Sequence, residues 1–275
     1  MNSNKLVPLE EAASLIQPGE TLALGGMTLY RRPVAFVRAL IARLPRPEAL
    51  TILSFAAGFE TDLLIGAGMV SRLRSCYCGL EVFGLAPMFT QAAQQGQIRI
   101  VEETEASLAF GMRAHLAGVS FMPGLAWLGT DLPRLRPDVK VIDDPYQPGN
   151  RVVAFPAIKW DVAVIHALKA DQAGNALLNS NVVVDVELAV GARDVIITAE
   201  EIVERFDSPV HISGAVVRMV VHAPHGAWPT SCYPLYPLAG GEILRYVDAC
   251  NAGQFEQYIE EFISPVSSSA SDQPG

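Results

Sequence analysis

Short apolar runs alternate with longer amphipathic stretches along almost the whole chain. The runs have the length of single strands and are followed by turn residues, which is typical of strands buried inside a sheet. The longer stretches place apolar residues three and four positions apart, as in helices with one buried face. Leu9, Ala12, Ala13 and Ile16 share one face of the first expected helix. This alternation predicts an α/β protein with a mainly parallel sheet between helices.

The expected elements follow one another without a linker. Strands are expected over residues 21–24, 50–55, 74–78, 98–101, 139–142, 152–154, 162–167, 182–184, 194–198 and 216–221. Helices or helical turns are expected over residues 8–16, 33–44, 62–65, 69–73, 87–95, 106–116, 242–250 and 254–263. We therefore predict a single domain over residues 1–263, without internal repeats. The remaining residues, 264–275, are rich in serine and are expected to be disordered.

Composition narrows the class of protein. Of the 275 residues, 50% are hydrophobic, and the mean hydropathy is +0.27. No run reaches the roughly 18 apolar residues of a membrane helix, so the excess apolar surface predicts oligomerisation. The net charge of −9, without a run of Lys and Arg, argues against a nucleic-acid partner. The amino-terminal residues lack the apolar core of a secretion signal, so a cytoplasmic location is expected.

The four cysteines do not form a metal motif. Cys76 and Cys78 lie two residues apart on an expected strand, and Cys232 and Cys250 stand alone. No second pair at the spacing of a zinc site accompanies them. We therefore expect reduced, buried thiols and no bound metal.

A glycine pair follows the first expected strand. Gly25 and Gly26, with Met27 after them, would let a ligand approach the main chain, and their N–H groups could bind an anion or a thioester oxygen. A tight turn before a helix explains the same glycines. Arg31 and Arg32 stand where the next helix begins, so one of them could bind a carboxylate or a phosphate. The alternative is a solvated helix start or an ion pair within the chain.

Three carboxylates cluster after the expected strand 98–101. Glu102, Glu103 and Glu105 would lie at the carboxyl edge of the sheet, where open α/β sheets bind ligands. On an extended backbone Glu103 and Glu105 would share one face. A partly dry carboxylate there could act as a base or a nucleophile. Acidic residues before the expected helix 106–116 are also typical of an ordinary helix N-terminus.

Two further segments could contribute to a site. His166 ends an apolar strand, where a histidine either transfers protons or makes structural hydrogen bonds. Residues 226–237 are rich in proline and aromatic side chains, and we expect an ordered surface loop that suits a partner or the rim of a ligand site. The chain lacks the hydrolase motifs G-x-S-x-G and H-E-x-x-H.

Taken together, segments from nearly the whole chain resemble the α-type subunit of class I coenzyme A transferases, especially the glutaconate type. The matching segments are Gly25-Gly26-Met27 with Arg32-Pro33, LLIGAGMVSRLRSCYCGLEVFGLAPMF (63–89), VEE…AGVSFMPG…LGTDL (101–132), HALKADQAGNA (166–176), VIITAEEIV (195–203) and GAWPTSCYPLY (226–236). Their order and spread make the combination far more specific than any one segment.

The resemblance implies a three-layer α/β/α sandwich of the NagB/RpiA-like kind and a β-type partner subunit, in a heterotetramer or another α/β assembly. It implies that coenzyme A is a substrate and that no cofactor is needed. In ordinary members a glutamate of the β-type chain forms the covalent thioester, and this sequence lacks the corresponding Ser-Glu-Asn-Gly-type motif. The resemblance places the Gly25–Met27 loop near the acyl-CoA carbonyl, with Arg31 or Arg32 for a second carboxylate of the acyl group.

One branch of the family that this chain resembles has a different activity. Its members hydrolyse a carbon–carbon bond in CoA thioesters of steroid ring remnants, using a glutamate of the α-type chain. Glu105, or Glu102 with another placement of the gap, falls at that position here. Ligand-sensing regulators share the broad fold, but they usually carry an added interaction segment, which favours an enzyme. The sequence therefore predicts a CoA-transferase subunit, with the ring-opening hydrolase as the alternative.

Overall fold

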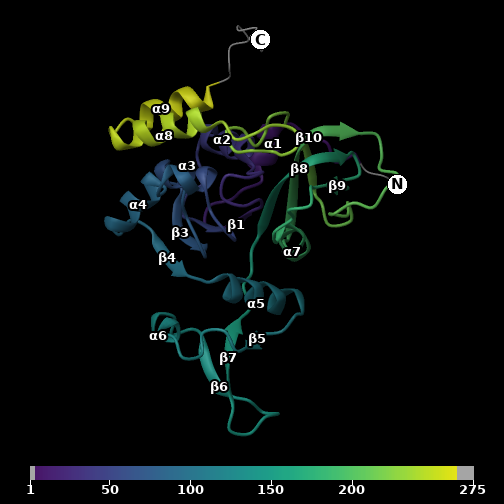
Figure 1. Ribbon diagram of the computed structural model, residues 1–275. Coiled ribbons are helices and arrows are strands. Elements are labelled where there is room, and N and C mark those ends of the chain that lie inside the picture. The colour runs from purple at the N-terminus through teal and green to yellow at the C-terminus, as the bar shows by residue number, and fades with distance from the viewer. Residues whose placement is uncertain (1–3, 265–275) are drawn as a thin grey trace.

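The computed structural model describes residues 4–264, and an eight-stranded sheet forms its centre (Figure 1). Its main path runs in the order β11-β10-β8-β1-β2-β3-β4 with all neighbours parallel, and the short β9 pairs antiparallel with β8. This arrangement confirms the predicted α/β fold. The strands are β1 (Thr21–Leu24), β2 (Leu50–Leu53), β3 (Val70–Ser75), β4 (Arg99–Glu102), β8 (Val162–Asp171), β9 (Ala176–Leu177), β10 (Asp194–Val203) and β11 (Met219–His222).

Helices cover the two faces of the sheet unequally. On one face, here called the six-helix face, α1, α2, α3, α4, α8 and α9 pack in one apolar cluster with strand residues such as Leu22, Ile52 and Leu73. On the other, the two-helix face, α5 and α7 pack on β1, β2, β8 and β10. The helices are α1 (Leu9–Ser14), α2 (Val34–Ala42), α3 (Phe59–Gly66), α4 (Pro87–Gln94), α5 (Glu105–Leu116), α6 (Leu132–Leu135), α7 (Asp185–Gly191), α8 (Gly240–Asn251) and α9 (Phe255–Ile263), with a 3-10 turn, η1 (Glu81–Phe83).

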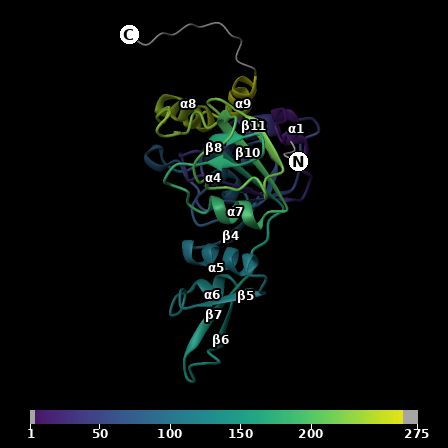
Figure 2. The same ribbon diagram turned by 90° about the vertical axis from the view of Figure 1, so that its right-hand side faces the viewer.

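A second, smaller sheet stands beyond α5, at the end of the molecule opposite α8 and α9 (Figure 2). Its three strands, β5 (Phe121–Gly124), β7 (Arg151–Pro156) and β6 (Lys140–Asp143), are antiparallel in that order. Phe155 stacks on Phe110 of α5 at 5.1 Å between ring centroids and meets Trp127 edge-on. These aromatic contacts fix the small sheet to the helix whose first residue is Glu105.

Two sequence predictions are wrong, and one strand of the small sheet was missed. Residues 70–73 form the start of β3 rather than a helical turn. This strand carries Arg72 and Arg74 on one side and so lacks a clear apolar pattern. Residues 182–184 form the turn before α7 instead of a strand; Arg31 holds both ends of this turn, and those contacts override β propensity. Strand β5 was not predicted because its sequence, FMPG, contains a proline.

The termini and the domain boundaries complete the description. The expected disordered tail lies outside the described residues except for Ser264, and the single domain over residues 1–263 stays a prediction. Within residues 4–264, the longest apolar helical stretch falls short of what is needed to cross a membrane.

Candidate active site

The glycine loop after β1 is packed against the chain itself. The N–H of Gly25 donates to the Val164 carbonyl at 2.9 Å, and that of Gly26 donates to Asp185 Oδ1 at 3.0 Å. The Met27 N–H donates to the Tyr30 carbonyl at 3.0 Å. The sequence suggested that these amides face a ligand, but here each already has an acceptor. The loop is thus ordered by internal hydrogen bonds.

Close packing also explains why the residues are glycines. Gly26 has φ +78°, and a Cβ on it would lie 2.5 Å from the Arg31 carbonyl oxygen. A Cβ on Gly25 would lie 2.8 Å from Asp185 Oδ1. Any side chain at either position would displace the buried carboxylate or the loop. The tight turn considered from the sequence is therefore the interpretation that the contacts support.

Arg31 joins the loop to one side of β1. Its side chain is fully buried and pairs with Asp185 at the start of α7. It also donates to the carbonyl oxygens of His166 at 2.6 Å and Asn181 at 3.1 Å. One guanidinium thus ties the loop to strand β8, to the turn before α7 and to α7 itself. Because it is enclosed, it has no free face for a substrate carboxylate.

Arg32 points to the other side of β1. It is also fully buried, and it pairs with Glu60 of α3. It donates to Ser54 Oγ at 3.1 Å, in the loop after β2. Of the two interpretations open from the sequence, both arginines fit the ion pair within the chain. The sequence missed their partners because Asp185 and Glu60 lie far from the loop along the chain and no motif marks them.

The three glutamates separate in the structure. Strand β4 ends at Glu102 and α5 begins at Glu105, so Glu103 and Glu105 do not share the expected extended face. Glu103 is only 4% exposed, and its Oε1 lies 3.0 Å from Arg74 Nη1 and 2.9 Å from Arg136 Nη1. Glu102 and Glu105 are exposed. Glu103 is therefore neutralised inside the chain, and the other two remain available at the surface.

Glu105 stands on a firmly anchored helix start. Thr104 is the N-cap, and it forms a reciprocal capping box with Ser107. Trp127 Nε1 donates to Thr104 Oγ1 at 2.9 Å, and the Ser107 hydroxyl also donates to Glu103. These contacts hold the first turn of α5 to strand β4 and to the small sheet. The backbone of Glu105 is thereby held in place, while its carboxylate stays in solvent.

The neighbours of Glu105 come from the end of β3. Cys76 follows that strand, and burial raises the pKa of its thiol to about 11, with a further contribution from the nearby Glu105 carboxylate. Tyr77, the next residue, is 40% exposed. The glycine loop follows β1, which is two inter-strand steps of about 4.8 Å each from β3 and three from β4. The two sets of predicted site residues therefore share the carboxyl edge of the sheet without touching.

His166 belongs to a buried polar network beside the glycine loop. Its Nδ1 lies 2.8 Å from Thr198 Oγ1 and its Nε2 lies 2.7 Å from Glu200 Oε1. Glu200 also accepts hydrogen bonds from the Tyr236 hydroxyl and, at 2.6 Å, from the His225 N–H. The network joins β8 and β10 to the proline-rich loop 226–237. Of the two roles considered for His166, these contacts fit the structural one.

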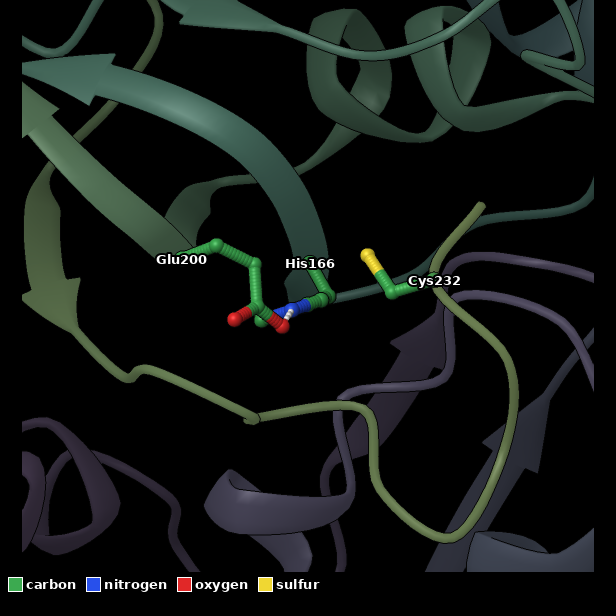
Figure 3. Close-up of side chains that lie close together, drawn as sticks. All are labelled: His166, Glu200 and Cys232. Carbon is green, nitrogen blue, oxygen red and sulfur yellow. Dashed lines mark hydrogen bonds and ion pairs between the residues drawn. The ribbon is translucent and has the colours of Figure 1, made fainter. Parts of the chain in front are cut away.

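His166, Glu200 and Cys232 also lie close enough for a metal ion, as Figure 3 shows. Both ring nitrogens and both carboxylate oxygens already have hydrogen-bond partners. Burial also raises the pKa of the Cys232 thiol to about 12, so the thiolate form that a metal binds is disfavoured there. The residues present therefore do not fit a metal site.

Comparisons with known proteins agree on one family. A family model described as Coenzyme A transferase matches residues 7–223. The α-type subunit of glutaconate CoA-transferase from Acidaminococcus fermentans is 31% identical, with 94% of this chain and 88% of the relative aligned. The crystal structure of that enzyme superposes with a TM-score of 0.87 at 29% identity, over 94% of this chain and 88% of that chain.

Two other relatives have different names. The crystal structure of a variant of the decarboxylase AibA/AibB has a TM-score of 0.89 at 30% identity, covering 96% of this chain and 100% of that one. The cholesterol ring-cleaving hydrolase IpdA subunit of Mycobacterium tuberculosis is 27% identical over 95% of this chain and 94% of the relative. Proteins with the same fold thus carry names for three reactions.

Proposed function

The chain belongs to the coenzyme A transferase family, and we propose that it is the α-type subunit of a transferase that moves CoA between a dicarboxylic acyl-CoA and a carboxylate. The observation that carries this proposal is the near full-length match to the α-type subunit of glutaconate CoA-transferase, at 31% identity. The match to the cholesterol ring-cleaving subunit is equally long but lower, at 27%. The chain is accordingly an enzyme subunit, and CoA enters as a substrate.

The contacts of the site support a division of labour between two chains. Acyl transfer needs a nucleophile and hydrogen-bond donors aimed at the developing oxyanion. Among residues 4–264, the Gly25, Gly26 and Met27 amides have acceptors within the chain, and Glu103 is held by two arginines. These groups form a framework, so a β-type partner subunit would supply the nucleophilic glutamate.

In the proposed reaction, the partner's glutamate carboxylate attacks the acyl-CoA carbonyl carbon, and the carbon–sulfur bond breaks to release CoA thiolate. The thiolate then attacks the glutamyl carbonyl of the mixed anhydride. This second step frees the first acyl group as a carboxylate and leaves a glutamyl-CoA thioester. A second carboxylate reverses both steps and departs with CoA. Covalent catalysis in this form divides one difficult exchange into easier steps.

This chain's residues would hold and shape that site. Arg31 and Arg32, through Asp185 and Glu60, fix the Gly25–Met27 loop in place as positioning residues. Glu102 and Glu105 would form the charged wall of the cleft that the partner completes. A dicarboxylic acyl group would find its counter-charge on the partner, because neither buried arginine has a free face.

The ring-opening hydrolase remains the second candidate, and one observation favours it. Glu105 is exposed, has no ion-pair partner among the described residues, and stands on an anchored helix start. A general base needs this combination of fixed position and access to a proton or a water. In that reaction Glu105 of this chain would activate water or the substrate, without a covalent intermediate.

One assay separates the two candidates. The complex with the β-type subunit is incubated with acetyl-CoA and glutaconate, and the partner is then treated with hydroxylamine to detect an acyl or CoA adduct. We expect exchange, an adduct on the partner, and less than about a tenfold fall in kcat for Glu105→Gln, since no covalent bond to it forms. Absence of both exchange and adduct would instead support the hydrolase, provided that the complex hydrolyses a ring-bearing CoA thioester and that Glu105→Gln lowers this hydrolysis by about 10²- to 10⁴-fold, the usual contribution of a general base. Glu256→Gln, which changes an exposed carboxylate in the first turn of α9, is the matched control.

A further inference from the structure

The two-helix face of the large sheet is only partly covered. The apolar cluster on this face includes Leu53 of β2 and residues of β1, β8 and β10, but no residue of β3 or β4. Leu53 lies opposite Arg74 in the β2–β3 register, so Arg74 projects to this face. Arg72, two residues earlier, projects to the same face, and Arg99 of β4 lies directly opposite it. Arg72, Arg74 and Arg99 are called the arginine face below.

The arginine face carries unbalanced charge. Arg74 pairs with Glu103. Arg72 and Arg99 are both exposed, and within residues 4–264 neither has a carboxylate oxygen within 4.0 Å. Because Arg72 and Arg99 occupy paired positions on neighbouring strands, their like charges repel each other. The free chain therefore tolerates a repulsive pair on a surface that no helix covers, although its net charge is −9.

Both features are unusual for an isolated α/β protein. Parallel sheets are normally buried on both faces, and here the β3–β4 part of one face is open. This part lies next to Cys76 and Glu105, where the strands β3 and β4 end. A surface that adjoins the candidate active site, lacks its own cover and carries excess positive charge is suited to a partner with carboxylates.

We propose that the arginine face is the docking surface of the β-type subunit, which covers β3 and β4 and places acidic side chains against Arg72 and Arg99. This inference rests on the proposed function, because it requires such a partner. The partner's cover would relieve the repulsion between the two arginines. Docking there would also close the cleft beside Glu105, so that assembly and completion of the site are one event.

Charge reversal tests the proposal. Arg72→Glu/Arg99→Glu and the milder Arg72→Gln/Arg99→Gln are compared with Lys169→Glu/Arg205→Glu. The control changes net charge as much as the first variant. It uses the half-exposed Lys169 of β8 and the exposed Arg205 after β10, both far from β4 in the strand order. The dissociation constant of the complex with the β-type subunit is measured by titration calorimetry at low and high salt. Thermal unfolding of each free chain shows whether it folds.

We expect association about 100-fold weaker for the Glu variant and about tenfold weaker for the Gln variant, with little change in the control. Added salt should weaken the wild-type complex more than the Gln complex. The free Gln variant should unfold at the same or a higher temperature, because the repulsive pair is gone. Unchanged association of both variants with the β-type subunit would overturn the proposal. If the variants assemble normally but have a raised KM for acyl-CoA, the arginines would instead bind the phosphates of CoA, which also overturns it.

The failure of this inference and that of the proposed function are distinguishable. A wild-type complex that assembles through the arginine face but shows no CoA exchange contradicts the function and leaves the docking surface standing. A complex that exchanges CoA and assembles equally well with all variants contradicts only the docking surface.

Discussion

At the β8–β10 end of the sheet's carboxyl edge the chain fills its own space, whereas at the β3–β4 end it leaves charged side chains in solvent. The closed half contains the buried pair of Arg31 with Asp185 and the contact of buried His166 with half-buried Glu200, all hydrogen-bonded to one another or to the main chain. The open half presents Glu105 and the arginine face. The buried, hydrogen-bonded polar groups of the closed half form the framework of the fold. The chemistry and the docking proposed above both use the half that the chain leaves open.

The largest loss of stability is expected on removing the buried ion pair of the closed half. Arg31→Met leaves Asp185 buried without its counter-charge, which should lower the free energy of unfolding by about 3–5 kcal/mol. Urea unfolding of the purified chain measures this loss. Arg31→Lys keeps the charge but not the planar fork that reaches three acceptors, so it should fall between wild type and Arg31→Met. A loss below about 1 kcal/mol in Arg31→Met would show that the pair does not hold the loop.

The next largest loss of stability is expected at Glu103, which lies beside the open half. Glu103→Gln removes the charge that Arg74 and Arg136 share, at a cost of about 1.5–3 kcal/mol in unfolding free energy. Hydrogen exchange should accelerate in the first turn of α5, because Ser107 donates to the same carboxylate. The capping Thr104 remains, so the helix itself should persist by circular dichroism. Unchanged exchange in that turn would mean that the capping box alone holds Glu105.

Acidification should lower the stability of the protein through His166 in the closed half. Burial lowers the pKa of His166, although the neighbouring Glu200 acts in the opposite direction. Burial alone would raise the pKa of Glu200. The hydrogen bonds that Glu200 accepts from His166 and Tyr236 outweigh burial and hold its pKa below the usual value. The unfolded chain therefore binds a proton at His166 from about pH 6.5 downward before the folded chain does. Stability should fall on acidification through that range, by at most about 1.4 kcal/mol per pH unit for this group.

A matched variant isolates this effect. His166→Gln keeps hydrogen-bonding groups near Thr198 and Glu200 but cannot bind the proton, so its unfolding free energy should change less between pH 7 and pH 5.5 than that of the wild type. The other histidines are common to both proteins and cancel in the difference. Parallel curves would mean that His166 titrates alike in the folded and unfolded states.

The sequence predicted the open half better than the closed half. The strand ends and the glutamates after them follow from local pattern, and Glu102 and Glu105 do lie at the predicted edge. The pairing of Arg31 with Asp185 joins residues far apart in the chain, and nothing in their local spacing foretells it. In the open half, the start of β3 was not recognised as a strand. Only Val70 and Leu73 are buried there, and the arginines between and after them interrupt the apolar pattern. Local periodicity thus predicted elements, while tertiary charge pairs decided what each polar residue does.

The smallest change in stability is expected for Glu105, and this prediction distinguishes the open half from the closed half most clearly. Glu105→Gln removes an exposed carboxylate from the first turn of α5, and the unfolding free energy should change by less than about 0.5 kcal/mol, because solvent screens its attraction to the helix dipole. The same variant should show its effect in turnover of the complex, whereas Arg31→Met shows its effect in stability of the free chain. If Glu105→Gln instead cost about 2 kcal/mol or more, Glu105 would be part of the framework, and the open half would be as structural as the closed one.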